Sequence, residues 1–131
     1  MSEDSGYPTH GRRCVGAAQR DVSPTDAQFL FGYPHVERMS TGVHDPLLAT
    51  AMALADGERQ AIFVVVDIIW LTKGQVAEAR RGIEEATGVP AAQIMISATH
   101  THSGPVTMDL LSASNDSVVP EPDPIYLGTL I

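Results

Sequence analysis

Two apolar segments decide the fold of this chain: Ala61–Leu71, with the sequence AIFVVVDIIWL, and Gln93–Thr99, with the sequence QIMISAT. Each is a short run of apolar and β-branched residues, which predicts a buried strand. The first run is apolar at nearly every position, and this pattern is typical of a central strand that is covered on both faces. Both runs therefore belong in the core of a sheet.

The residues between these two runs carry the signals of one helix. Thr72 can cap its N-terminus, and Gln75, three residues later, completes a capping-box pattern. Gly88 predicts its C-terminus, with a proline soon after. Apolar residues recur at helical spacing between these limits: Val76, Ala79, Ile83 and Ala86. Residues 61–99 thus form a strand–helix–strand unit, and its right-handed crossover makes the two strands parallel.

Weaker signals on the N-terminal side extend the sheet. Residues 14–18 are expected to form a short strand, and 46–55 a second one, although the apolar run in 46–55 also allows a short helix. Asp56–Gly57 predicts a hairpin-type turn. Residues 21–45 are expected to form a long loop. The predicted fold class is α/β, with the strand–helix–strand unit in a mixed, largely parallel sheet.

The domain organisation follows from length and composition. Residues 1–13 lack periodicity and combine Ser, Gly, Pro and acidic residues, so a flexible N-terminal lead is expected there. Residues 14–131 are expected to form one domain, which suits a chain of 131 residues. The last seven residues, IYLGTLI, indicate the start of a further element.

Charge and cysteine content exclude several classes of function. Sixteen acidic and eight basic residues give a net charge of −8, which argues against binding of nucleic acid. The one cysteine excludes an intrachain disulfide. No run of apolar residues approaches the roughly 18 that a membrane span needs, and the N-terminus lacks a signal-peptide core. The chain as written is expected in the cytoplasm, or outside the cell if its N-terminus is incomplete.

The strongest candidate for chemistry is the segment Thr99–Pro105, THTHSGP, at the expected end of the second parallel strand. In extended backbone, residues two apart project to one side, so His100 and His102 can aim two imidazoles into one site. Ligands of open α/β sheets usually bind at the carboxyl ends of strands, and neutral imidazole binds zinc. The structural alternative is two hydrogen-bonded histidines. A catalytic zinc normally has three protein ligands, so this pair alone does not complete a site.

Three further residues are weaker candidates. Asp67 lies within the first apolar run and can either act at a metal site or accept a structural hydrogen bond from nearby backbone. His44 lies in the loop and has either a site role or none. Tyr33 can donate a hydrogen bond to a substrate or simply pack in the loop. His10 and His35 are expected to be surface side chains.

These residues make the chain resemble the N-terminal part of the neutral/alkaline non-lysosomal ceramidase family. The resemblance covers about residues 15–105. Four segments carry it: Phe31–Tyr33 (FGY), Thr41–His44 (TGVH), Phe63–Asp67 (FVVVD) and Ile96–Pro105 (ISATHTHSGP). THTHSGP after an apolar strand is the specific signal, whereas FGY and TGVH are weak by themselves.

The resemblance implies a zinc-dependent amidohydrolase that cleaves the N-acyl amide bond of ceramide-like lipids into fatty acid and sphingosine. It implies that His100 binds zinc and that His102 is a catalytic residue, which contacts the reacting end of the substrate without binding the metal. The family's further zinc ligands, a His, a Glu and a Tyr, follow this motif and have no counterpart here. The chain is therefore expected to be a partial catalytic domain that depends on a downstream segment or a homo-oligomer.

Two alternatives stay open from the sequence. A barrel-type metallohydrolase also ends a strand with an HxH pair, but there the pair normally ends the first strand and the rest of the barrel follows it. A non-catalytic α/β module is the other alternative, because a parallel sheet without its remaining layers exposes edges and apolar faces that can bind a partner.

Overall fold

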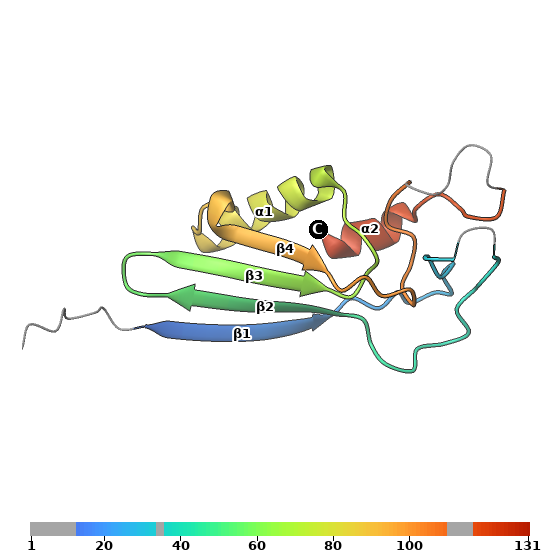
Figure 1. The fold of residues 1–131 in the computed structure, drawn as a ribbon, viewed down its shortest axis with the longest axis horizontal. Helices are drawn as coiled ribbons and strands as arrows, with labels where there is room; N and C mark the ends of the chain where they lie inside the picture. The colour runs from blue at the N-terminus through green and yellow to red at the C-terminus, as the bar shows by residue number, and fades with distance from the viewer. Residues whose placement is uncertain (1–12, 34–35, 110–116) are drawn as a thin grey trace, which may run out of the picture.

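Four strands form a mixed sheet in the order β1-β2-β3-β4 (Figure 1). The computed structural model describes residues 13–33, 36–109 and 117–131. The pairs β1–β2 and β2–β3 are antiparallel, and β3–β4 is parallel. The strands are β1 (Cys14–Asp21), β2 (Leu48–Ala55), β3 (Gln60–Val66) and β4 (Ile94–Ala98).

The predicted α/β class and mixed sheet are confirmed. β3, helix α1 (Lys73–Thr87), the short 3-10 helix η1 (Ala91–Gln93) and β4 form the expected strand–helix–strand unit. Parallel pairing is confined to β3–β4 among the described strands. The physical reason is the tight turn after β2, since so short a connection can join only antiparallel neighbours. The strand expected over 46–55 is also confirmed.

β3 ends at Val66, whereas the apolar run continues to Leu71. The chain turns at Asp67: its N–H donates to the Leu48 carbonyl at 2.9 Å, and the N–H of Ile68 donates back to the Val66 carbonyl at 2.9 Å. The expectation of a strand through Leu71 is therefore wrong. Its apolar residues leave the sheet and enter the loop core, where Ile69 is 1% exposed.

Both ends of α1 are those that the sequence predicts. The Thr72 hydroxyl accepts from the Gln75 N–H at 3.1 Å, and the Gln75 side chain accepts from the Thr72 N–H at 2.8 Å. Gly88 ends the helix with a φ of 74°, a left-handed conformation that costs glycine little. The capping box is thus complete, and it satisfies two backbone donors that the first turn would leave without partners.

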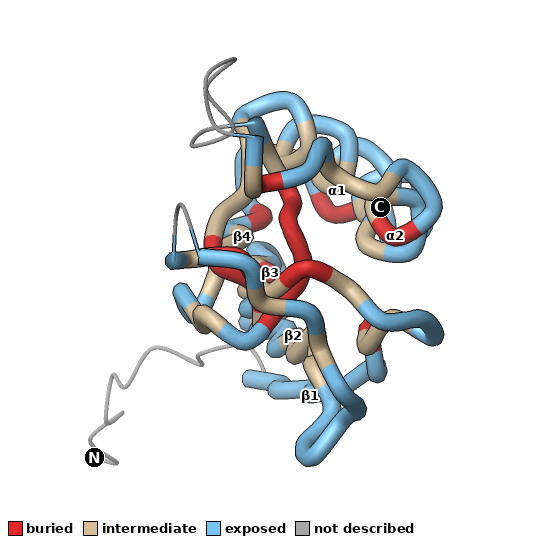
Figure 2. Tube along the Cα trace, turned by 90° about the vertical axis from the view of Figure 1, so that its right-hand side faces the viewer, coloured by how far each residue is buried: buried red, intermediate tan, exposed pale blue. Residues whose placement is uncertain are grey.

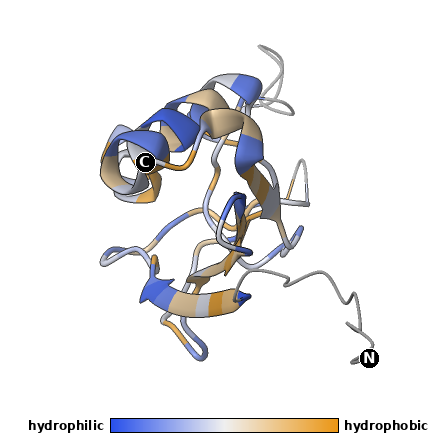
Figure 3. Ribbon diagram, turned by 90° about the vertical axis from the view of Figure 1, so that its left-hand side faces the viewer, coloured by the Kyte–Doolittle hydropathy of each residue, from blue (hydrophilic) through white to orange (hydrophobic). Residues whose placement is uncertain are grey.

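The C-terminal residues form helix α2 (Pro124–Leu130), which confirms the element expected there. Its N-cap is Asp123, whose carboxylate accepts from the Ile125 N–H at 2.9 Å and from the Gln28 side chain at 3.1 Å. α1 and α2 lie on the same side of the sheet (Figures 1 and 3). An apolar cavity of about 370 Å³ is lined by residues of both helices and of the strands.

Three groups of buried side chains hold these layers together. One lies between α1 and the sheet, around Ile62, Val89 and Ile94, and a second surrounds Val66 and Ile68 near the end of β3. The third lies in the loops beyond the carboxyl ends of the parallel strands and comprises Phe29, Phe31, Ile69, Val106 and Val119. This loop core supports the end of the molecule where the histidines lie.

The expectation that β3 is covered on both faces is wrong for the described residues. The helices cover only the face that carries Ile62 and Val66, and Val65 on the opposite face is 38% exposed. On the same face, Met52 of β2 and Met95 of β4, the cross-strand partners of Phe63, are 40% and 50% exposed. β1 is exposed along its length, Cys14 included (Figure 2), because it lies at the edge of the sheet.

The β2–β3 turn carries a carboxylate whose effect on stability depends on pH. The backbone N–H groups of Arg59 and Glu58 donate to Asp56 Oδ1 at 2.8 and 3.1 Å, and they hold the pKa of this carboxyl below its ordinary value of 3.8. A carboxyl whose pKa is lower in the folded state than in the unfolded state stabilises the folded state at pH values above the unfolded-state pKa. This stabilisation is lost as the pH falls through the folded-state pKa.

Replacing Asp56 by alanine is therefore expected to lower the free energy of unfolding at pH 7, and this deficit should shrink as the pH falls below 3.8. Urea unfolding of both proteins between pH 7 and pH 2.5 measures the deficit. Asp56→Asn is the matched control, because an amide oxygen accepts the same two bonds without titrating. A deficit that grows on acidification would contradict the assignment.

Candidate functional site

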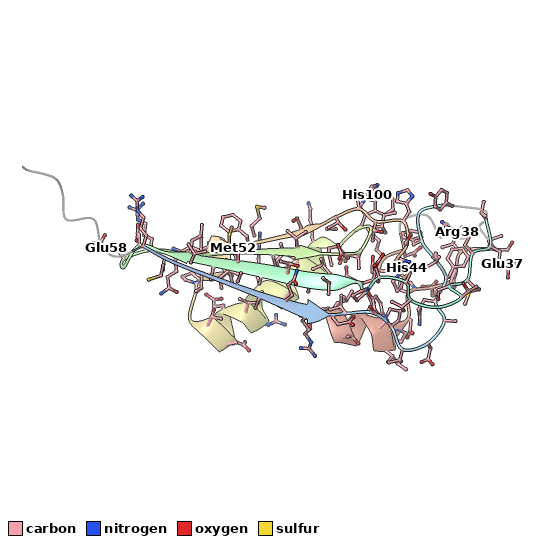
Figure 4. The ribbon with its side chains drawn as sticks, turned by 90° about the horizontal axis from the view of Figure 1, so that it is seen from below. Glu37, Arg38, His44, Met52, Glu58 and His100 are labelled. Carbon is pink, nitrogen blue, oxygen red and sulfur yellow. The ribbon has the colours of Figure 1, made fainter. Side chains whose placement is uncertain are left out.

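His100 lies just beyond the end of β4, at the end of the molecule opposite the β2–β3 turn. Figure 4 shows it at the same end as Arg38 and His44, far from Glu58 in that turn. The pairing with the chain after β3 continues past the strand, because the Thr99 N–H donates to the Val66 carbonyl and the His100 N–H to the Ile68 carbonyl, each at 3.0 Å. The position at the carboxyl ends of the parallel strands is the expected one.

The backbone at His100 is left-handed, with a φ of 65°, and not extended as the HxH argument assumes. This conformation is uncommon for a residue with a side chain and costs energy that neighbouring contacts must offset. The two rings nevertheless meet: the centroids of His100 and His102 are 5.1 Å apart, with an angle of 74° between the planes.

A hydrogen bond orients the His100 ring. Its Nδ1 lies 3.1 Å from the carbonyl oxygen of Ile69. A carbonyl only accepts, so the neutral ring carries its proton on Nδ1 and keeps a lone pair on Nε2. A backbone carbonyl on one ring nitrogen is the usual arrangement behind a metal-binding histidine, because it fixes both the tautomer and the orientation.

The two histidine rings form the middle of a continuous row of aromatic side chains. Trp70 contacts His100 on one side, with centroids 5.2 Å apart, and also meets the ring of Phe31 edge-on at 5.6 Å. Tyr33 contacts His102 on the other side, with centroids 5.1 Å apart and an angle of 80°. Residues from the FGY segment therefore lie at both ends of the row.

Gly32 lies between Phe31 and Tyr33 in the FGY segment. A Cβ on Gly32 would lie 2.5 Å from Cγ, 2.6 Å from Nδ1 and 2.9 Å from Cβ of His102. Real Cβ contacts are essentially never closer than 3.0 Å. The His102 ring thus lies directly against the backbone of Gly32.

The remaining predicted site residues lie apart from this row of rings. The Asp67 carboxylate accepts from the Leu48 N–H at 3.0 Å, which is the structural alternative that the sequence left open. His44 pairs with Asp45 at 2.8 Å, and its side chain is 97% exposed. Both residues line a cavity of about 800 Å³ in the loops, together with Thr101 and Ser103, which alternate with the histidines. Nothing in these contacts assigns either residue a site role.

Two expected surface histidines, His10 and His35, lie outside the described residues. Sequence reasoning missed Trp70 and Arg38. Trp70 lies in the apolar run Ala61–Leu71 that was expected to be a strand. Its position near the carboxyl end of that run is the signal in the sequence that points to the site. The guanidinium carbon of Arg38 lies 4.3 Å from the centroid of the Tyr33 ring, a cation–π contact for which the sequence contained no signal.

The side chains around His100 provide one zinc ligand and not a complete zinc site. Its Nε2 lone pair is available, and imidazole is a preferred zinc ligand. Within residues 13–33, 36–109 and 117–131, no three His, Cys, Asp or Glu side chains are grouped as a metal site. Among the same residues, no helix has the length and apolar character that crossing a bilayer requires.

Comparison with known proteins agrees with this geometry. A solved neutral ceramidase from Pseudomonas aeruginosa is similar, with a TM-score of 0.63 and 25% identity over 72% of this chain and 16% of its own length. A ceramidase solved in complex with C2 has a TM-score of 0.71 and 20% identity over 90% of this chain and 19% of its own. The chain thus spans less than a fifth of the length of either protein.

The family comparison covers most of the chain. Residues 14–113 match the family described as neutral/alkaline non-lysosomal ceramidase, N-terminal. This range includes all four strands, α1 and the THTHSGP segment. The chain therefore belongs to the neutral/alkaline non-lysosomal ceramidase family.

Proposed function

We propose that this chain supplies part of the active site of a zinc-dependent amidohydrolase that cleaves the N-acyl amide bond of ceramide-like lipids. The observation that carries the proposal is the orientation of the His100 ring, with Nδ1 on the Ile69 carbonyl at 3.1 Å and the His102 ring beside it. Family membership supports hydrolysis, and the ceramidase names of the two similar structures support the substrate class.

His100 is proposed to hold the metal through Nε2. When bound, zinc lowers the pKa of a coordinated water and polarises the carbonyl under attack. The other ligands are proposed to come from polypeptide beyond the described residues, either a downstream segment or a second copy of the chain. This division agrees with the fraction of the similar structures that the chain spans.

His102 is proposed to contact the reacting end of the substrate. Its ring meets His100 on one side and Tyr33 on the other, so the ring nitrogens are held at a fixed place beside the metal ligand. A histidine fixed in this way is placed to act as a general acid or base on the substrate. The Phe31 and Trp70 rings close the other end of the row, which keeps His100 from turning away from its carbonyl partner.

The test uses the polypeptide that carries this chain together with the downstream segment proposed to supply the other ligands. Metal analysis first determines the zinc concentration at which this polypeptide is loaded, and mass spectrometry then measures release of sphingosine from a short-chain ceramide. We expect release that depends on zinc and that His102→Ala abolishes while zinc stays bound. Zinc-loaded polypeptide that releases no sphingosine would overturn the proposed activity, and zinc binding unchanged by His100→Ala would overturn the metal role of His100.

A further inference from the structure

We infer that Gly32 is a positioning residue for His102: the absence of a side chain at Gly32 lets the imidazole lie against the loop backbone in the orientation that the reaction needs. The catalytic part of this inference rests on the proposed function. The steric part rests on the three distances of 2.5, 2.6 and 2.9 Å between a Cβ at this position and the His102 side chain. All three nearest atoms belong to that one residue.

The loop that carries Gly32 cannot easily move away from the ring. The N–H of Phe31, the preceding residue, donates to the Gly104 carbonyl at 3.0 Å, and Leu30 forms an antiparallel bridge with Pro105. These contacts attach the FGY segment to the THTHSGP segment itself. The Phe31 side chain is fully buried as well. A methyl group at position 32 is therefore expected to displace the ring and leave the loop in place.

The other sides of the ring are also occupied. His100 lies on one side and Tyr33 on another, with centroids 5.1 Å from that of His102 in both cases. The Arg38 guanidinium covers the Tyr33 ring in turn, 4.3 Å from its centroid. Displacement of the His102 ring thus changes its contact with His100 or with Tyr33.

The chain contains a matched control for the backbone. Gly32 and Gly42 both have positive φ, 121° and 148°, so alanine is strained at either position. A Cβ on Gly42, however, meets no atom within 4 Å. Gly32→Ala and Gly42→Ala therefore share the backbone cost, and they differ in the contact with His102.

The experiment compares these two variants by ¹H–¹³C correlation spectra of the histidine rings, with the His102 signal assigned from His102→Gln. We expect Gly32→Ala to move the His102 ring signals and Gly42→Ala to leave them in place. In the zinc-loaded polypeptide that includes the downstream segment, Gly32→Ala should lower kcat by about 100-fold with little change in KM, as expected for a misplaced catalytic group. Equal spectra for the two variants would overturn the inference.

The spectra separate this inference from the proposed function, because ring positions are measured whether or not the chain hydrolyses an amide. If Gly32→Ala fails to fold, the double variant Gly32→Ala/His102→Gly distinguishes a clash with the His102 ring from backbone strain at position 32. It lacks every atom that the new Cβ would contact at short distance, so folding should return. A double variant that stays unfolded, while Gly42→Ala and His102→Gly fold, would show that backbone strain is the cause and overturn the inference.

Discussion

Replacing His100 by alanine is expected to reduce the affinity of the chain for zinc by at least about a hundredfold. Loss of a residue that only hydrogen-bonds to a metal ligand costs up to about a hundredfold, and loss of the ligand itself should cost at least as much. The reason is the orientation of the ring. The Ile69 carbonyl holds the proton on Nδ1, so Nε2 is available to a metal before the metal arrives. Titration calorimetry with zinc, together with metal analysis of the purified chain, measures the loss.

Two histidine variants serve as controls for this prediction. His44→Ala removes an imidazole that is 97% exposed and paired with Asp45, so it is expected to leave zinc affinity unchanged. His102→Ala is expected to keep most of the zinc affinity and lose hydrolysis, because this residue is proposed to contact substrate. Equal losses in His44→Ala and His100→Ala would indicate adventitious binding by surface histidines and would falsify the metal role.

Replacing Phe31 by alanine is expected to lower the free energy of unfolding by about 3–5 kcal/mol, the range for removing a buried aromatic side chain. Phe31 is fully buried and belongs to the loop core, and its ring centroid lies 5.6 Å from that of Trp70 in an edge-to-face arrangement. The loss combines the transfer free energy of the ring with the cost of the cavity that remains. Urea denaturation followed by far-UV circular dichroism measures it.

The matched control for Phe31→Ala is Ile125→Ala. The Ile125 side chain, on α2, is 82% exposed, so its removal should change the free energy of unfolding by no more than about 0.5 kcal/mol. The fluorescence of Trp70, the single tryptophan, should change in Phe31→Ala and stay constant in the control. Similar destabilisation in both variants would show that the loop core does not support the site as described.

Local signals predicted the secondary structure well where backbone chemistry is local. The Thr72 capping box and the left-handed Gly88 both act on residues within one turn, so the bounds of α1 follow from the sequence. The hairpin turn at Asp56–Gly57 acts over three residues, through bonds from Glu58 and Arg59 to the Asp56 carboxylate. The end of β3 did not follow, because it depends on Asp67 pairing with Leu48, which is distant in the chain.

The site was predicted in part for the same reason. The THTHSGP segment and its place after a parallel strand are visible in the sequence, and so is the family resemblance that the comparisons confirm. The bond of His100 to Ile69 and the contact of Gly32 with His102 join residues about 30 and 70 positions apart. No pattern within one segment carries those contacts.

The sequence by itself determined the α/β class, the strand–helix–strand unit and the histidine pair at its carboxyl end, because hydrophobic periodicity and capping operate between neighbours along the chain. Only the tertiary structure decided which face of the sheet is covered and where β3 ends. It alone also placed the FGY segment around His100 and His102. These features depend on which distant residues become neighbours, and close packing at such contacts, as between the Gly32 backbone and the His102 ring, leaves no room for an added Cβ at its ideal position.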